Sequence, residues 1–366
     1  MAQKRAQATI GPPHRSSLEE TPRNDAAGSL PLGRRIFSLR NIVSVFLTLG
    51  VLYLVCRQVL GFDWGDVWAG VRGASLGLFA LAFAAFYCTF PVRALRWKAL
   101  LGNVGYRHAD RRPMPSSFGL TRIMYASWFA NCVTVARLGD AYRGYLLKRE
   151  ADVSFAVTLG TVLAERLLDL VVLAAMMGVA VLIVFHGSLP SEAVQALAVG
   201  LTLSVVAVVG LLGMRRFRWA FERVLPKRLH AHYLRLEHGV IDSFRGKLSL
   251  LVALSVAGWL LEGAALYGVA AAVGAPVAVA GALVVALAAS LLTVVPFTPA
   301  GLGVAEAGMI VMLGWLGLDA PTATAVTLLY RLINYWSIVV LGFLLYIFGR
   351  NGNRLAEEDR AREVYL

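Results

Sequence analysis

The chain has 366 residues, 58% of them hydrophobic and 16% charged, and a formal net charge of +13. Its apolar residues gather in stretches of about 20, the length of helix that crosses a bilayer core of about 30 Å, which excludes an ordinary water-soluble globular protein. The basic excess lies between these stretches, where it sets membrane orientation, so it is no sign of a nucleic-acid partner.

The composition predicts an all-α fold, a polytopic transmembrane helical bundle of about eight helices with one or two re-entrant or broken helices. Residues 1–40 are polar and rich in Pro, Arg, Ser and Asp, which predicts a disordered cytoplasmic tail rather than a signal peptide. The transmembrane domain is expected at 41–349, followed by a cytoplasmic C-terminal tail at 350–366.

The apolar runs predict six spans, at 41–59, 75–92, 164–185, 194–213, 249–273 and 322–347. The loops 93–112 and 214–248 are rich in Lys and Arg, which predicts that both are cytoplasmic. Both termini are then expected on the cytoplasmic side of the inner membrane.

The apolar segment 116–136 has basic residues on both sides, so a single crossing would break the charge rule. A re-entrant hairpin that enters from the cytoplasm and returns fits this pattern better. At its edge, a polar group surrounds Gly139, made of Asn131, Arg137, Asp140 and Arg143. Two guanidiniums at a cavity mouth can hold a phosphate by paired N–H bonds, with Asp140 orienting one of them. The alternative is that these arginines only set topology.

The segment LAERLLDL begins a long apolar run and carries Glu165, Arg166 and Asp169. Glu165 and Asp169 are four residues apart and share a helix face, and Arg166 can reach Asp169. Because ionisable groups at membrane depth usually face partners or water, we expect an inward charge network here, with a solvated helix end as the alternative.

The loop 214–248 contains an amphipathic pattern that predicts a helix on the inner membrane surface. Its apolar positions recur at helical spacing: Leu229, Tyr233, Leu236, Val240 and Phe244.

Further along, Glu262 lies near the middle of the span 249–273, where a lone acid needs a partner. Arg331, about ten residues into the last span, is the candidate partner.

The segments 278–296 and 300–317 meet at PFTPAGLGVAE, which cannot be one smooth membrane helix. Its prolines cannot donate hydrogen bonds and its glycines permit turns, so it predicts either a break between two half-helices or a turn between two full crossings. A break would leave free amides that suit an anionic group, and Glu306 either caps the following helix or acts in binding. The residues concerned are Pro296, Pro299, Gly301, Gly303 and Glu306.

No catalytic motif is recognisable: the sequence lacks a serine-hydrolase elbow, zinc-ligand spacing and a Gly-rich nucleotide loop. The three cysteines lie in apolar segments at no metal-ligand spacing. We therefore expect no cofactor, no metal and no catalytic residue.

Three motifs in this order resemble the transmembrane, flippase-like region of the lysylphosphatidylglycerol synthases, also found as a stand-alone family of membrane proteins. They are N-x5-R-x-G-D-x2-R at Asn131 to Arg143, E-R-L-x-D-L at Glu165 to Leu170, and P-x2-P-x-G-L-G-x2-E at Pro296 to Glu306. Two positions depart from the family pattern: Val135 stands where proline is frequent, and Ala300 where the first of two glycines is frequent.

The resemblance implies a flippase-like transporter that moves or binds an anionic or modified polar lipid and lacks the synthase domain. Membrane lipids and a separate lipid synthase are then the expected partners. Two alternatives belong to other classes. One is a membrane glycosyltransferase or other lipid-modifying enzyme, for which Asp63 and Asp66 are candidate metal ligands, and the other is a non-transporting scaffold for a separate lipid synthase.

Overall fold

The computed structural model describes residues 64–106, 113–134, 138–185, 226–293 and 299–345, with isolated positions between 202 and 223. All of them belong to one compact unit, Val43–Leu366. Every regular element in these ranges is a helix, which confirms the predicted fold class. The predicted tails, the span 41–59 and most of the span 194–213 lie outside the described residues.

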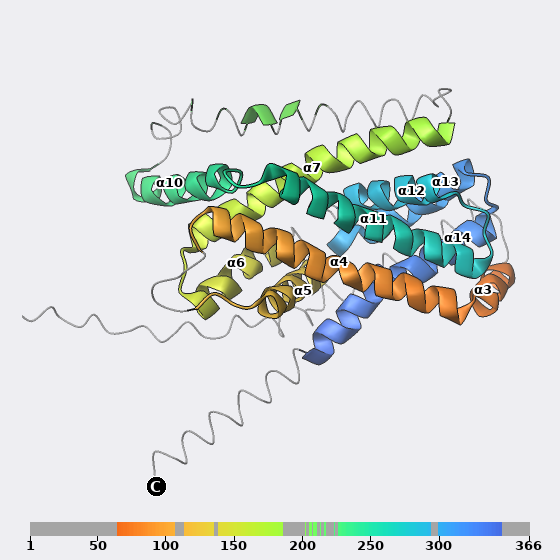
Figure 1. Cartoon of the computed structure of the whole chain (residues 1–366). Helices are drawn as coiled ribbons and strands as arrows, with labels where there is room; N and C mark the ends of the chain where they lie inside the picture. Colours follow the sequence, from red (N-terminus) through yellow and green to blue (C-terminus); the bar gives the residue numbers. More distant parts are fainter. Residues whose placement is uncertain are drawn as a thin grey trace, which may run out of the picture. The chain divides into compact units, whose positions relative to one another are not determined.

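Four helices among the described residues are long and apolar enough to cross a membrane. They are α4 (Leu76–Asn103), α7 (Phe155–Phe185), α11 (Leu248–Val273) and Ala320–Leu345, which begins as α14 (Ala320–Arg331). The helices α4 and α11 lie side by side, and the short helix α3 (Trp64–Gly73) precedes α4 (Figure 1). Large apolar side chains on these helices are exposed, Leu81 and Val179 among them, as lipid contact requires. The chain is a multi-pass membrane protein.

Helix α4 is longer than the sequence indicated. Residues 93–103 were predicted as part of a cytoplasmic loop. In the structure they are helical, and α4 continues past Pro91 as far as Asn103. Arg93 and Arg96 are therefore not loop cations, because both are buried in the domain. They can be buried because acidic side chains, described below, pair with them.

The sequence predicted that the chain reverses within 116–136, but the structure shows no reversal between Ser117 and Val133. Helix α5 (Ser117–Val133) runs unbroken through this segment, and Ser116 caps its start by accepting a hydrogen bond from the Gly119 amide at 3.2 Å. The chain turns after Val133, and α6 (Leu138–Ala151) packs back against α5. The hairpin thus has two full helical limbs.

The predicted amphipathic helix is confirmed as α10 (Lys227–Asp242). Its second half packs on α7, where Gly239 and Gly160 face each other so closely that a Cβ on either would meet the other's backbone. Val240 is buried, whereas Leu229 is 46% exposed. The apolar face therefore serves partly for packing on α7.

The break predicted around PFTPAGLG separates two short apolar helices, α12 (Val279–Leu292) and α13 (Val304–Trp315). At about 1.5 Å per residue they are about 21 and 18 Å long, less than a bilayer core of about 30 Å. Of the two predicted arrangements, half-helices thus fit better than two full crossings. Between them, Ala300 has φ 47° and ψ 32°, the left-handed conformation that a side chain disfavours.

Replacing Ala300 by Gly should stabilise the protein. The left-handed backbone costs an L-residue about 1–2 kcal/mol, and the greater freedom of glycine in the unfolded chain offsets part of the gain, so we expect about 0.5–1 kcal/mol. Thermal unfolding in detergent measures this change. Ala307→Gly, at an exposed position in α13, is the matched control and should destabilise. Equal losses in both variants would contradict the left-handed geometry.

Candidate functional site

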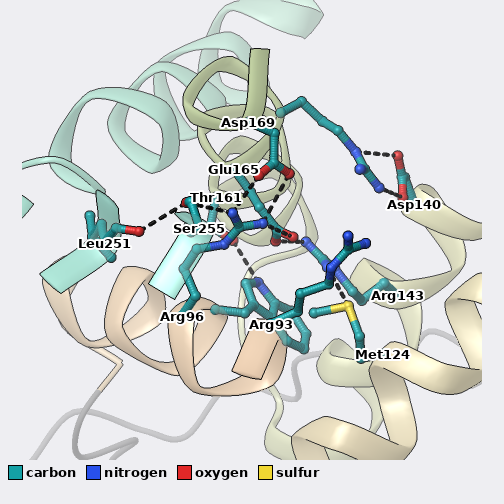
Figure 2. A network of polar contacts seen from close by, with 12 residues as sticks. Arg93, Arg96, Met124, Asp140, Arg143, Thr161, Glu165, Asp169, Leu251 and Ser255 are labelled. Carbon is teal, nitrogen blue, oxygen red and sulfur yellow. Dashed lines mark hydrogen bonds and ion pairs between the residues drawn. The ribbon is translucent and has the colours of Figure 1, made fainter. Parts of the chain in front are cut away.

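Buried charged side chains from α4, α6 and α7 meet in one network, to which α11 contributes the hydroxyl of Ser255 (Figure 2). Arg96 of α4 is its centre and is 2% exposed. Its Nη2 donates to Glu165 Oε1 at 2.8 Å and to Asp169 Oδ2 at 2.9 Å. Its Nη1 donates to the other oxygen of Asp169 and to Ser255 Oγ, the latter at 2.6 Å. One guanidinium thus ties α4 to α7 and α11.

Glu165 bridges two arginines. Its second oxygen accepts a hydrogen bond from Arg143 of α6, whose guanidinium lies 4.4 Å from the centre of the Trp97 ring and also contacts the Met124 sulfur. Arg143 is only 1% exposed. The Glu165 carboxylate therefore links α6 of the hairpin to both α7 and α4.

A second buried pair lies one helical turn away along α4. Arg93 Nη2 donates to Glu262 Oε1 at 2.9 Å, and Ser290 Oγ donates to the other carboxylate oxygen at 3.0 Å. The Arg93 guanidinium lies over the rings of Trp128 and Trp259, at 4.6 and 5.0 Å from their centres. Aromatic faces attract a cation, so they compensate part of the hydration that the arginine has lost.

At the edge of the network, Arg166 of α7 holds Asp140 of α6 with two hydrogen bonds of 2.8 and 3.1 Å. Both side chains are partly exposed. Asn131 Oδ1 accepts a hydrogen bond from the Gly139 amide at 2.8 Å, and Asn131 Nδ2 donates a longer one to Asp140 at 3.4 Å. This contact connects the end of α5 to the start of α6.

The charges of this network balance. Its cations are Arg93, Arg96, Arg143 and Arg166, and its anions are Asp140, Glu165, Asp169 and Glu262. Removing an ion from water costs several kcal/mol, which only close opposite charges and further hydrogen bonds repay. Even so, the buried Nε–H groups of Arg96 and Arg143 have no acceptor in the described part of the chain.

The structure confirms that Glu165 and Asp169 share an inward face, because both bind Arg96. Two predicted partners are wrong. Arg166 pairs with Asp140 instead of Asp169, since the whole of Asp169 is engaged by Arg96.

Glu262 pairs with Arg93 instead of Arg331. Sequence reasoning missed Arg93 and Arg96 because it assigned both to a loop. A charge count would not have found them, because the acids of the predicted spans already equal the cations. The acids are Glu165, Asp169 and Glu262, and the cations are Arg57, Arg166 and Arg331.

The helix break has an ion pair of its own. The Glu306 carboxylate accepts hydrogen bonds from the Gly303 amide at 2.7 Å and from Arg331 Nε at 2.6 Å. Arg331 also contacts the Ala300 carbonyl at 3.4 Å and lies over the Tyr335 ring, 4.9 Å from its centre. Glu306 therefore caps α13, and the Gly303 amide is not free for a ligand.

Not every predicted site residue can be placed. Arg137 and Pro296 lie outside the described residues, as does the side chain of Pro299. Gly301 is described, with φ 68°. The residues of the helix break and the residues around Gly139 thus belong to different ion pairs, Glu306–Arg331 and Glu165–Arg143, and the second pair is part of the network.

Gly139→Ala should destabilise the protein strongly. A Cβ there would collide with the Ser127 carbonyl and with Asn131 Oδ1, so α6 would have to move away from α5. We expect a loss of about 2 kcal/mol or more, measured by thermal unfolding in detergent.

Gly178→Ala in α7 is the matched control, because a Cβ there meets nothing within 4 Å. That variant should be neutral or slightly stabilising. Equal behaviour of the two variants would show that the close α5–α6 contact is wrong.

The comparisons with known proteins support this assignment of motifs. Residues 41–342 match the family model of the lysylphosphatidylglycerol synthase TM region. A UPF0104 membrane protein of Methanocaldococcus jannaschii is 34% identical over 224 residues, which is 61% of this chain and 95% of that protein. A UPF0104 membrane protein of Methanothermobacter thermautotrophicus is 24% identical over 82% of this chain and 93% of its own length.

A more distant relative is named as an enzyme, which is another functional class. Glycosyltransferase AglD of Haloferax volcanii is 25% identical over 321 residues, which is 77% of this chain but only half of that protein. The family match, by contrast, covers most of this chain and contains all three motifs. The chain belongs to the family of the lysylphosphatidylglycerol synthase transmembrane region.

Proposed function

We propose that this protein binds an anionic or modified polar lipid and moves its headgroup across the membrane along the buried network. The observation that carries the proposal is the triad of Arg96, Glu165 and Arg143, fully buried between bilayer-length helices. Ionisable side chains in such a position are costly, and a functional site is their default interpretation.

The chemistry of the triad suits a phosphate. A guanidinium presents its N–H groups in a fork that fits a phosphate as well as a carboxylate, so a lipid phosphate can take the place of Glu165 on one arginine. The Nε–H groups of Arg96 and Arg143 provide further donors. A headgroup oxygen that accepted one of them would remove the cost of a buried unpaired donor, about 1–3 kcal/mol.

The arginines of the network also exchange carboxylate partners when an anionic headgroup arrives. Its balanced charges make the resting state neutral, so an incoming anion must displace an internal carboxylate to find a cation. Each displaced carboxylate still has another donor: Glu165 has two arginines, and Glu262 has Ser290 beside Arg93. Such sharing lowers the cost of each step along the path.

The family name supports a lipid substrate, since its full-length members are called lysylphosphatidylglycerol synthases. The name of the Haloferax volcanii relative favours a second candidate, a glycosyltransferase. Asp66, one of its two proposed metal ligands, is exposed in α3, and Asp63 lies outside the described residues. Turnover of polyprenyl-linked sugars that depends on a divalent metal and is lost in Asp66→Asn would favour this candidate.

The test is lipid scrambling by the full chain in vesicles, with fluorescent phosphatidylglycerol and phosphatidylcholine as probes. The double variant Arg143→Gln/Glu165→Gln keeps the network neutral but removes one cation from the path. We expect it to lose about tenfold or more of the phosphatidylglycerol rate, because a charge-assisted contact to the phosphate is lost.

The matched control is Arg122→Gln/Glu150→Gln. This pair also joins α5 to α6, but at the surface, where Arg122 is 66% exposed. Its removal should leave the rate unchanged. A folded network variant that transports phosphatidylglycerol at the wild-type rate would refute the assignment.

A further inference from the structure

A cavity of about 540 Å³ lies where the end of α4 meets the starts of α5 and α11. Its walls are mostly apolar and include Leu95, Leu120, Leu250 and Leu251. Two cations, Lys98 and Lys247, line it as well. The cavity thus combines an apolar lining with positive charge.

The cavity lies one helical turn from the network on each of its three helices. On α5, the lining residue Leu120 precedes Met124, which contacts Arg143. On α11, the lining residue Leu251 accepts a hydrogen bond from Ser255, the partner of Arg96. On α4, the lining residue Ala99 follows Arg96 by three positions. One turn is about 5.4 Å, so the cavity lies close to the network, although none of the network's charged residues lines it.

The two lysines differ from the buried arginines in their partners. In the part of the chain that the structure describes, every network arginine is paired with a carboxylate, whereas neither lysine is. Lys98 donates to the Ser117 hydroxyl at 3.0 Å, and both lysines are exposed. Helix α11 begins directly after Lys247 without a side-chain cap, so its partial positive charge adds to that of the lysine.

Two of the leucines extend the cavity toward the surface. Leu95 is 45% exposed and Leu250 is 48% exposed, although both line the cavity. An apolar edge beside lysines that have no carboxylate partner among the described residues suits a molecule with a charged head and a hydrocarbon tail. A small soluble anion would gain nothing from the leucine walls.

We propose that this cavity is the loading site for an anionic phospholipid. The lipid phosphate lies between Lys98 and Lys247, and the upper part of the acyl chains lies against Leu95 and Leu250. The inference rests on the proposed function, for which it supplies the point of entry: a headgroup held here is one turn from Arg96.

Binding to the full chain in detergent tests the loading site without any transport step. The probe is dioctanoyl phosphatidylglycerol, and its Kd is obtained from the concentration dependence of the Tm. The double variant Lys98→Gln/Lys247→Gln should raise this Kd about tenfold or more. Lys148→Gln/Arg228→Gln removes the same charge from exposed positions outside the cavity and should leave it unchanged.

A third variant tests the cavity without changing charge. Ala99→Phe fills part of it and should weaken binding as well. Two further probes test whether the site binds a lipid rather than free phosphate, and an anionic rather than a zwitterionic headgroup. Inorganic phosphate at the same concentration should not raise the Tm, and dioctanoyl phosphatidylcholine should raise it less.

An unchanged Kd in the lysine variant or in Ala99→Phe would overturn the loading site. Equal stabilisation by inorganic phosphate would also overturn it, because the site would then hold a soluble anion. If the wild type binds the lipid as described but does not scramble it, the transport proposal fails and the loading site stands. If scrambling is normal while the lysine variant binds like the wild type, the loading site fails alone.

Discussion

The need to neutralise every ion inside a membrane domain is the constraint on which this structure depends. A lone buried charge costs several kcal/mol, so each arginine and each carboxylate between the helices must lie close to an opposite charge. Arg96, Glu165 and Arg143 meet this requirement together, and in doing so they fix how α4, α6 and α7 pack. The Arg93–Glu262 pair does the same for α4 and α11, which are neighbours along their lengths. Buried ion pairs thus hold several neighbouring helices of this apolar bundle together.

The same constraint separates the roles of the sequence motifs. Gly139 and Asn131 close the α5–α6 hairpin, and Asp140 anchors it to α7 through Arg166. Glu306 caps α13 and holds Arg331, so the helix break is stabilised from within. The only charges that line the cavity of the proposed loading site are the lysines at its rim, neither of which is paired with a carboxylate in the described ranges. In the proposed path, the headgroup passes from the lysines of the cavity to the buried arginines, which exchange a carboxylate partner for it.

Much of the fold could be predicted from the sequence, because apolar length and helical periodicity are local signals. The spans around α7, α11 and α14 and the amphipathic α10 follow from them. The inward face of Glu165 and Asp169 was also predictable, since four residues make one turn. Partner choice was not, because it depends on which helices are neighbours. The end of α4 was missed for a related reason: basic residues there indicated a loop, and only the acids of other helices explain why Arg93 and Arg96 are buried. The left-handed backbone at Ala300 was not predicted either, because an alanine where the family often has glycine indicates a less sharply bent break.

The most direct measurement of the central claim is a double-mutant cycle on the free energy of unfolding, with Arg143→Gln, Glu165→Gln and the double variant. Each single change leaves one buried charge uncompensated and should cost about 3–5 kcal/mol. The double variant restores neutrality, because Arg96 and Asp169 still compensate each other, so it should lose less than the two single losses together by at least about 1 kcal/mol. Losses that simply add would show that the two side chains do not form one buried, charge-balanced network.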